Sequence, residues 1–164
     1  MLLQPLESLF DESVGLPADI WALGCTIFDI CGKYSLFEAS PYFRPSKDDV
    51  LVEMVDTLGM LPGRWWKKWE AGSRYFNSDG TQNTDNNRTS FRAKPRSLPV
   101  RLANMRCNRY GPREEDPEQM SIDDEIGLLK LLMSMLVYEP LKRATAEGVV
   151  KSEWVQQLLR DSEN

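Results

Sequence analysis

The stretch PADIWALGCTIFDI, from Pro17 to Ile30, is apolar around almost its whole circumference when it is placed on a helix. Its leading proline, and Gly32 just beyond it, favour a helix from Pro17 to Cys31. A helix that is apolar on all sides is expected to be buried. Asp19 nevertheless lies in its first turn, where the helix dipole favours a carboxylate. A buried carboxylate needs hydrogen-bond donors, so Asp19 either anchors another segment or is a plain N-terminal charge.

Length and composition are those of a globular chain. Its 164 residues suffice for one domain with a core, and 41% of them are hydrophobic. The net charge of −5 argues against nucleic acid as the main partner. The segment from Asn86 to Arg113 holds eight Lys or Arg and no Asp or Glu, and such a run is more often a solvated connection than a binding surface.

No targeting or membrane segment is recognisable. The opening residues, MLLQPLESLF, lack the basic start and the long apolar run of a signal peptide. No stretch approaches the roughly 20 apolar residues that span a bilayer. Cys25, Cys31 and Cys107 form no paired framework, so we expect reduced thiols in a cytoplasmic or nuclear protein without a membrane partner.

Several kinds of chemistry are excluded by residues that the chain lacks. It contains no histidine, which rules out Ser–His and Cys–His nucleophilic pairs and ordinary histidine-ligated zinc sites. The glycine-rich phosphate-binding patterns are also absent. The run from Ser78 to Asn86 lacks the glycine that a calcium loop requires, and it is typical of a polar turn. We therefore expect no catalytic, cofactor-binding or metal-binding residue.

The remaining pattern predicts further helices. One is expected from Lys47 to Leu58, because Ser46 and Asp49 form a capping box and Gly59 follows the last apolar residue. The face opposite its apolar residues carries three carboxylates: Asp49, Glu53 and Asp56.

Three more helices are expected after residue 62. GRWWKKWEA, residues 63–71, spaces its tryptophans in a pattern that more often marks a core than a ligand site. The next helix starts at a capping box of Ser121 and Asp124, and its nearly continuous apolar run should be buried. The last runs from about Thr145 to Leu159. Residues 77–120 have little periodicity and are expected to form a long irregular polar and basic insert. The predicted fold class is therefore all-α, a helical bundle.

Three segments resemble one family when they are taken together. ADIWALGCTIF, residues 18–28, resembles the DxWxxG signature of the central helix in the C-lobe of eukaryotic protein kinases. MLVYEPLKRATAEGVVKSEW, residues 135–154, resembles the segment that closes this lobe. Residues 35–62 are similar to the region after the signature in cyclin-dependent, MAP and SR-protein kinases, and residues 58–80 most resemble fungal kinases of the SR-protein type. The likeness extends from about Pro5 to Leu158.

The resemblance assigns structural roles to the signature residues. Asp19, Trp21 and Gly24 occupy its three positions. In kinases this helix anchors the lobe, and its buried aspartate accepts hydrogen bonds from the backbone of the catalytic loop. The resemblance therefore implies that Asp19, Trp21 and Gly24 are structural anchors of the lobe.

An ion pair is implied as well. Kinases end their activation segment with Ala-Pro-Glu, and this glutamate pairs with the arginine of the closing segment. Glu7 and Arg143 occupy these two positions. Pro5 and Leu6 replace the Ala and Pro of the motif, so the residues before position 5 need not follow the family.

The implied activity is ATP-dependent protein phosphorylation, with ATP and magnesium as cofactors in the full-length family. The chain lacks the glycine-rich loop, the strand lysine, the His-Arg-Asp loop and the Asp-Phe-Gly motif that this reaction uses. The leading hypothesis is thus a truncated, pseudokinase-like fragment, with residues 1–164 forming part of a kinase domain that is inactive alone.

Two other hypotheses remain open. The chain could be a non-catalytic interaction module, in which Asp49, Glu53 and Asp56 form a docking face for basic Arg/Ser-rich segments, or which pairs with another kinase lobe. It could also be an unrelated helical domain.

Overall fold

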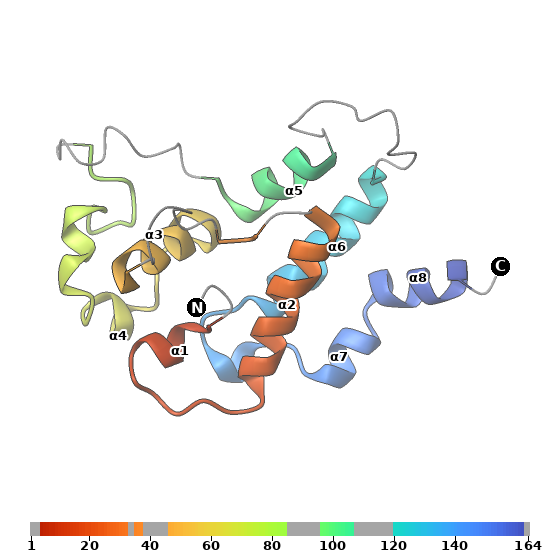
Figure 1. The fold of residues 1–164 in the computed structure, drawn as a ribbon, viewed down its shortest axis with the longest axis horizontal. Coiled ribbons are helices and arrows are strands. Elements are labelled where there is room, and N and C mark those ends of the chain that lie inside the picture. The colour runs from red at the N-terminus through yellow and green to blue at the C-terminus, as the bar shows by residue number, and fades with distance from the viewer. Residues whose placement is uncertain (1–3, 33–34, 38–45, 85–95, 107–119, 163–164) are drawn as a thin grey trace. The chain divides into compact units, whose positions relative to one another are not determined.

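The computed structural model describes residues 4–32, 35–37, 46–84, 96–106 and 120–162 (Figure 1). The chain divides into two compact units, of which the first comprises residues 3–36 and 98–164 and the second residues 37–97. Within the described ranges every regular element is a helix, apart from one isolated antiparallel bridge between Phe76 and Gln82. The expected all-α class is confirmed.

The first unit is organised around two helices. Its described elements, in chain order, are α1 (Leu6–Leu9), α2 (Pro17–Gly32), α5 (Leu98–Arg106), α6 (Ile122–Met135), the 3₁₀ helix η2 (Pro140–Lys142), α7 (Ala146–Val150) and α8 (Glu153–Ser162). Helix α6 contacts α2, α5 and α8, while α2 also contacts α5 and η2 (Figure 1). The pair α2 and α6 is therefore the centre of this unit.

Helix α2 ends one residue beyond the expected boundary. It buries six residues: Ala18, Ile20, Trp21, Gly24, Cys25 and Phe28. Gly24 lies where α2 meets α6, because a methyl group at its Cβ position would be 3.2 Å from Cβ of Met135 and 3.1 Å from Cδ2 of Leu136. A larger residue would push the two helices apart. The anchor position that the resemblance assigned to Gly24 is thus a close approach between helices.

Helix α6 begins where the sequence indicates. Its N-cap is Ser121, whose Oγ accepts a hydrogen bond from the backbone N–H of Asp124 at 3.0 Å. Its buried residues are Leu128, Leu131, Leu132 and Met135. The expected burial of the apolar run is met only in part, because Ile126 and Met133 within it are exposed, as is Ile122 before it.

The last helix expected from Thr145 to Leu159 is in fact two, α7 and α8. Ser152 lies at the break, where its Oγ donates to Val149 O at 2.7 Å and accepts from the backbone N–H of Val155 at 3.4 Å. The apolar repeat runs on through this serine, so periodicity alone does not reveal the break. Trp154 then packs on Gly127 of α6, since a methyl group there would lie 2.9 Å from Cδ1 of the indole.

Helix α5 corrects the expectation of an irregular insert at residues 77–120. It packs on α2 and α6 and buries Leu98, Arg101 and Leu102. Leu98, Leu102 and Met105 do have a helical spacing. Arg101 and the basic residues around it indicate an exposed segment instead, although Arg101 is buried. Residues 85–95 and 107–119 of the stretch lie outside the described residues.

The second unit is built on α3 (Lys47–Leu58), which has the expected bounds. The capping box is formed, with the backbone N–H of Ser46 donating to Asp49 Oδ2 at 2.9 Å and that of Asp49 donating to Ser46 Oγ at 3.2 Å. Gly59 ends the helix with a φ of 89°, a conformation that favours glycine. The buried residues are Val50, Leu51, Val52, Met54, Val55 and Thr57.

The tryptophan-rich helix expected over residues 63–71 is shorter. Helix α4 (Gly63–Trp66) is followed by the 3₁₀ helix η1 (Glu70–Arg74). Between them Trp69, with φ −88° and ψ 85°, leaves the helical region, and its Nε1 donates to Asp48 Oδ1 at 2.8 Å. Trp65 and Trp69 are buried, as expected of a core stripe, while Trp66 is half-buried. Tertiary contacts of Trp69 thus override the helical pattern.

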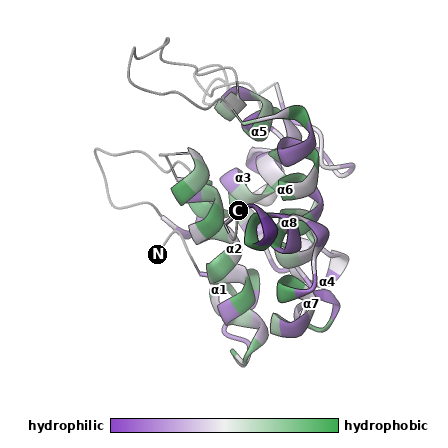
Figure 2. Ribbon diagram, turned by 90° about the vertical axis from the view of Figure 1, so that its right-hand side faces the viewer, coloured by the Kyte–Doolittle hydropathy of each residue, from purple (hydrophilic) through white to green (hydrophobic). Residues whose placement is uncertain are grey.

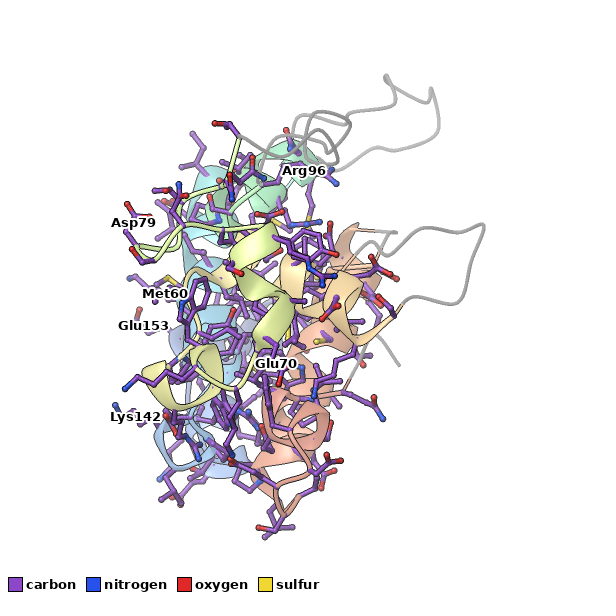
Figure 3. All side chains as sticks on the ribbon, turned by 90° about the vertical axis from the view of Figure 1, so that its left-hand side faces the viewer. Met60, Glu70, Asp79, Arg96, Lys142 and Glu153 are labelled. Carbon is purple, nitrogen blue, oxygen red and sulfur yellow. The ribbon has the colours of Figure 1, made fainter. Side chains whose placement is uncertain are left out.

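The expected polar turn is present over the described part of residues 78–86. Asp79 Oδ1 accepts hydrogen bonds from Oγ1 and N of Thr81 at 2.6 and 2.9 Å, and Gly80 adopts a φ of 82°. The hydrogen bonds from Thr81 lower the pKa of the Asp79 carboxyl. Figure 3 shows the Asp79 side chain pointing away from the ribbon, as in a solvent-exposed turn.

Candidate functional site: a buried arginine centre

Arg143 is a cation that is almost completely removed from solvent. Its side chain is 0% exposed and that of Glu7 is 2% exposed. The two form a bidentate pair, in which Nη1 donates to Glu7 Oε1 at 2.7 Å and Nη2 donates to Glu7 Oε2 at 2.6 Å. This planar fork is the strongest geometry available to an arginine and a carboxylate. The pairing expected from the resemblance is therefore present.

Three backbone carbonyls complete the surroundings of the guanidinium. Nε donates to Val137 O at 2.7 Å, Nη1 to Pro17 O at 3.1 Å and Nη2 to Tyr138 O at 3.1 Å. A guanidinium carries five N–H groups, so all of its donors are used. Arg143 thereby joins α1, the start of α2 and the chain that follows α6. Sequence patterns could not indicate these carbonyls, because any residue supplies one.

Two aromatic rings pack beside the ion pair. Trp21 is 0% exposed, and its ring stacks with that of Tyr138 at a centroid distance of 6.2 Å and an interplanar angle of 28°. The guanidinium carbon of Arg143 lies 5.0 Å from the centroid of the Trp21 ring, within the range of a cation–π interaction. We call Glu7, Trp21, Tyr138 and Arg143 the arginine centre. Tyr138 is the member that the sequence analysis did not single out.

Local turns bring the two charged residues into place. Pro5, in an extended conformation, precedes α1, and the backbone N–H groups of Phe10 and Glu12 donate to Glu7 O at 3.2 and 3.0 Å. On the other side, the backbone N–H of Arg143 donates to Pro140 O at 3.2 Å and so closes η2. Both prolines pre-set φ for a turn, which aims the glutamate and the arginine at one another.

Asp19 does not take part in the arginine centre. It lies in the first turn of α2 and is exposed. Its carboxylate is thus on a different side of the helix from Trp21 and Gly24, which are buried. The anchoring of a catalytic loop that the resemblance implies for Asp19 therefore stays a prediction.

Two cysteines in α2 are poor nucleophiles. Burial, with a smaller effect from the nearby Asp29 carboxylate, raises the pKa of the Cys25 thiol to about 12. Burial also raises the pKa of the half-buried Cys31 thiol. Because the thiolate is the reactive form, both groups stay protonated and unreactive near neutral pH.

The three carboxylates of the expected docking face are not equivalent. Asp49 is exposed, and its Oδ2 is held by the backbone N–H and Oγ of Ser46 at 2.9 and 2.7 Å. Glu53 and Asp56 are half-buried, and Asp56 Oδ1 accepts from Gln82 Nε2 at 3.5 Å. The three carboxylates therefore share α3, and part of their charge serves the capping box, while a docking role for them stays a prediction.

The resemblance implies ATP and magnesium only for the full-length family, and it assigns no residue of this chain to either group. In the described ranges no group of three or more His, Cys, Asp or Glu is placed to hold a metal ion. The sequence also contains no glycine-rich phosphate loop. We therefore derive no chemical step through either group. Among the helices that the structure describes, none combines the length and apolar character that crossing a bilayer requires.

Comparison with known proteins shows what the chain is similar to. No protein-family model matches the chain. It is 27% identical over 157 residues to the serine/threonine-protein kinase SKY1 of Saccharomyces cerevisiae, covering 93% of this chain and 18% of the relative. It is also 27% identical over 150 residues to the serine/threonine-protein kinase SRPK of Physarum polycephalum, covering 91% and 32%.

Both of these relatives are serine/threonine kinases, and the SR-protein-kinase-like type recurs among the proteins to which the chain is similar. A third relative, SRSF protein kinase 3 of Mus musculus, is 26% identical over 151 residues, covering 92% of this chain and 24% of the kinase. The chain thus spans less than a third of the length of these relatives and corresponds to one part of them. The similarity to kinases that the sequence motifs indicated is confirmed.

Proposed function

We propose that this chain forms the C-terminal part of a serine/threonine kinase C-lobe, where it supports the catalytic segments without supplying a catalytic group. The arginine centre is the observation that carries the proposal. A buried pair between the glutamate that ends the activation segment and the arginine of the closing segment is what the kinase resemblance implies. The similarity to parts of SR-protein-type kinases agrees with it.

The proposal includes the absence of phosphotransfer by the chain alone. Phosphoryl transfer depends on positioning the nucleotide and on metal and cationic groups around the γ-phosphate. Neither a glycine-rich phosphate loop nor a His-Arg-Asp motif occurs in the sequence. Asp19 is the one exposed residue of the three signature positions. A single carboxylate cannot bind the nucleotide phosphates in place of a glycine-rich loop.

Purified chain incubated with labelled ATP, magnesium and a basic protein substrate should incorporate no phosphate above the blank. The proposal would be contradicted if phosphate were incorporated and if Asp19→Asn abolished this incorporation while Asp11→Asn left it unchanged. Asp11 is the matched control, because it is another exposed carboxylate of the first unit. The transcript upstream of the Met1 codon provides a second check: in-frame His-Arg-Asp and Asp-Phe-Gly motifs support the kinase assignment.

The acidic face of α3 favours a second candidate function, the binding of basic Arg/Ser-rich segments. Asp49, Glu53 and Asp56 lie at i, i+4 and i+7 on one helix, and at least Asp49 is exposed. An Arg–Ser repeat peptide should therefore bind weakly at low salt and lose affinity as salt is added, because exposed charges are screened beyond about 10 Å at 0.1 M. Fluorescence anisotropy of a labelled peptide measures this.

Variants of the same face provide the control. Glu53→Gln with Asp56→Asn removes two charges and keeps the Asp49 capping box intact, and it should weaken peptide binding severalfold. Asp123→Asn with Glu147→Gln removes two carboxylates from the first unit and should leave binding unchanged. Equal binding by both double variants, or no binding at low salt, rejects this second function.

A further inference from the structure

Helix α6 carries an apolar row that the described residues leave largely exposed. Ile122, Ile126 and Met133 are 63%, 47% and 61% exposed, and Leu129 between them is half-buried. The intervals along the row are four, three and four residues, the spacing of the apolar seam of a two-stranded coiled coil. We call these four residues the α6 seam.

The seam lies away from the packed face of the helix. Leu128, Leu131 and Leu132 point into the first unit and are buried, while α8 packs on α6 at Gly127. At 100° per residue the seam falls on a separate side from both. Figure 2 shows α8 beside α6, in agreement with the contacts between the two helices. Large apolar side chains aligned on one exposed stripe are typical of an interaction surface.

Charges beside the seam identify a partner that fits it. Asp123 and Lys130 are seven residues apart, so they lie on the same flank within about 20° of each other. Lys130 is only loosely held, at 3.8 Å from an exposed Glu153. When two α6 helices pack antiparallel around a two-fold axis, the flank that carries Asp123 and Lys130 faces the same flank of the other copy. Asp123 of one copy would then meet Lys130 of the other, twice per pair.

The opposite orientation is less favourable. In a parallel pair the acidic first turns, which contain Asp123, Asp124 and Glu125, would lie side by side and repel each other. The two helix dipoles would also be aligned in parallel. An antiparallel pair instead brings each acidic turn towards the lysine-bearing half of the other helix.

We propose that the α6 seam binds a second copy of this chain, with the two α6 helices antiparallel. Helix α6 is already folded on α2, so association does not have to form it. The seam covers only about two heptads, or about 21 Å of helix, which makes the interface small. We therefore expect a reversible dimer with a dissociation constant on the order of 100 µM. This inference does not depend on the proposed kinase role.

Sedimentation velocity of the full chain over a range of concentrations tests the proposal. The wild type should shift from monomer to dimer as concentration rises. Ile126→Lys should raise the dissociation constant at least tenfold, because it places a charge in the centre of the seam. Ile30→Lys is the matched control, since Ile30 is an isoleucine 73% exposed on α2, and it should leave association unchanged.

A charge exchange tests the orientation. Asp123→Lys and Lys130→Glu should each weaken association severalfold, because like charges then meet across the axis, and the double variant should restore it. Far-UV circular dichroism verifies that each variant is folded. A wild type that stays monomeric overturns the proposal, as does equal loss in Ile126→Lys and Ile30→Lys. Failure of the double variant to recover rejects the antiparallel arrangement.

Discussion

Replacing Arg143 with alanine is expected to lower the free energy of unfolding by about 3–5 kcal/mol, the cost of removing one partner of a buried ion pair. The side chain is 0% exposed and makes five hydrogen bonds. Without it the Glu7 carboxylate is buried and uncompensated, and three backbone carbonyls lose their donor. Urea denaturation followed by circular dichroism measures the change.

Two control variants separate the ion pair from general effects of mutation in η2. Lys142→Ala removes the neighbouring exposed cation and should change stability by less than about 0.5 kcal/mol. Glu7→Leu combined with Arg143→Met removes both charges, so it should be less destabilising than Arg143→Ala alone. An Arg143→Ala variant as stable as Lys142→Ala would show that the arginine centre does not hold the first unit together.

Replacing Trp21 with alanine is expected to lower the free energy of unfolding by about 3–5 kcal/mol. Its ring is 0% exposed, so the change opens a cavity in α2 and removes the stacking with Tyr138. Thermal unfolding at a fixed protein concentration measures the loss.

Trp154 provides the matched comparison for Trp21. It belongs to the same unit but is half-buried, whereas Trp21 is completely buried, so removal of the Trp154 side chain leaves a smaller cavity. Trp154→Ala should therefore cost clearly less than Trp21→Ala. Trp21→Ala and Arg143→Ala should also be non-additive, because the guanidinium lies 5.0 Å from the indole. A larger loss for Trp154→Ala than for Trp21→Ala would contradict the central place of the arginine centre.

Helices with strong terminal signals were predictable from the sequence. For α3, a capping box and a terminal glycine agreed with the apolar period, and both ends were found where expected. For α2, the leading proline marked the start correctly, and the end differed by one residue. In both helices local preference and tertiary burial favour the same structure, which is why pattern and fold coincide.

Two of the three misses share a physical cause, namely contacts between residues distant in sequence. Trp69 leaves the helical region where its indole bonds Asp48, twenty-one positions earlier. Helix α5 was missed because Arg101, a residue that is usually exposed, is buried in it. Neither of these two features is visible in a local window. The third miss is local, because Ser152 divides α7 from α8 through hydrogen bonds with Val149 and Val155, each three positions away.

The candidate site was predictable only in part. Glu7 and Arg143 were identified through the resemblance to kinases, since 136 positions separate them and no periodicity connects them. Tyr138 and the three carbonyls became apparent only in the folded chain. The α6 seam was also missed, because a nearly continuous apolar run does not indicate which of its side chains the fold leaves uncovered.

Calorimetric titration of magnesium–ATP into the purified chain tests the central claim most directly, namely that this part of a kinase lobe supports chemistry that it does not perform. Only the heat of dilution is expected up to about 1 mM nucleotide. This concentration would reveal any binding free energy more favourable than roughly −4 kcal/mol. Magnesium–ADP should behave identically. Saturable binding of one ATP per chain would contradict the account and place a nucleotide site within these residues.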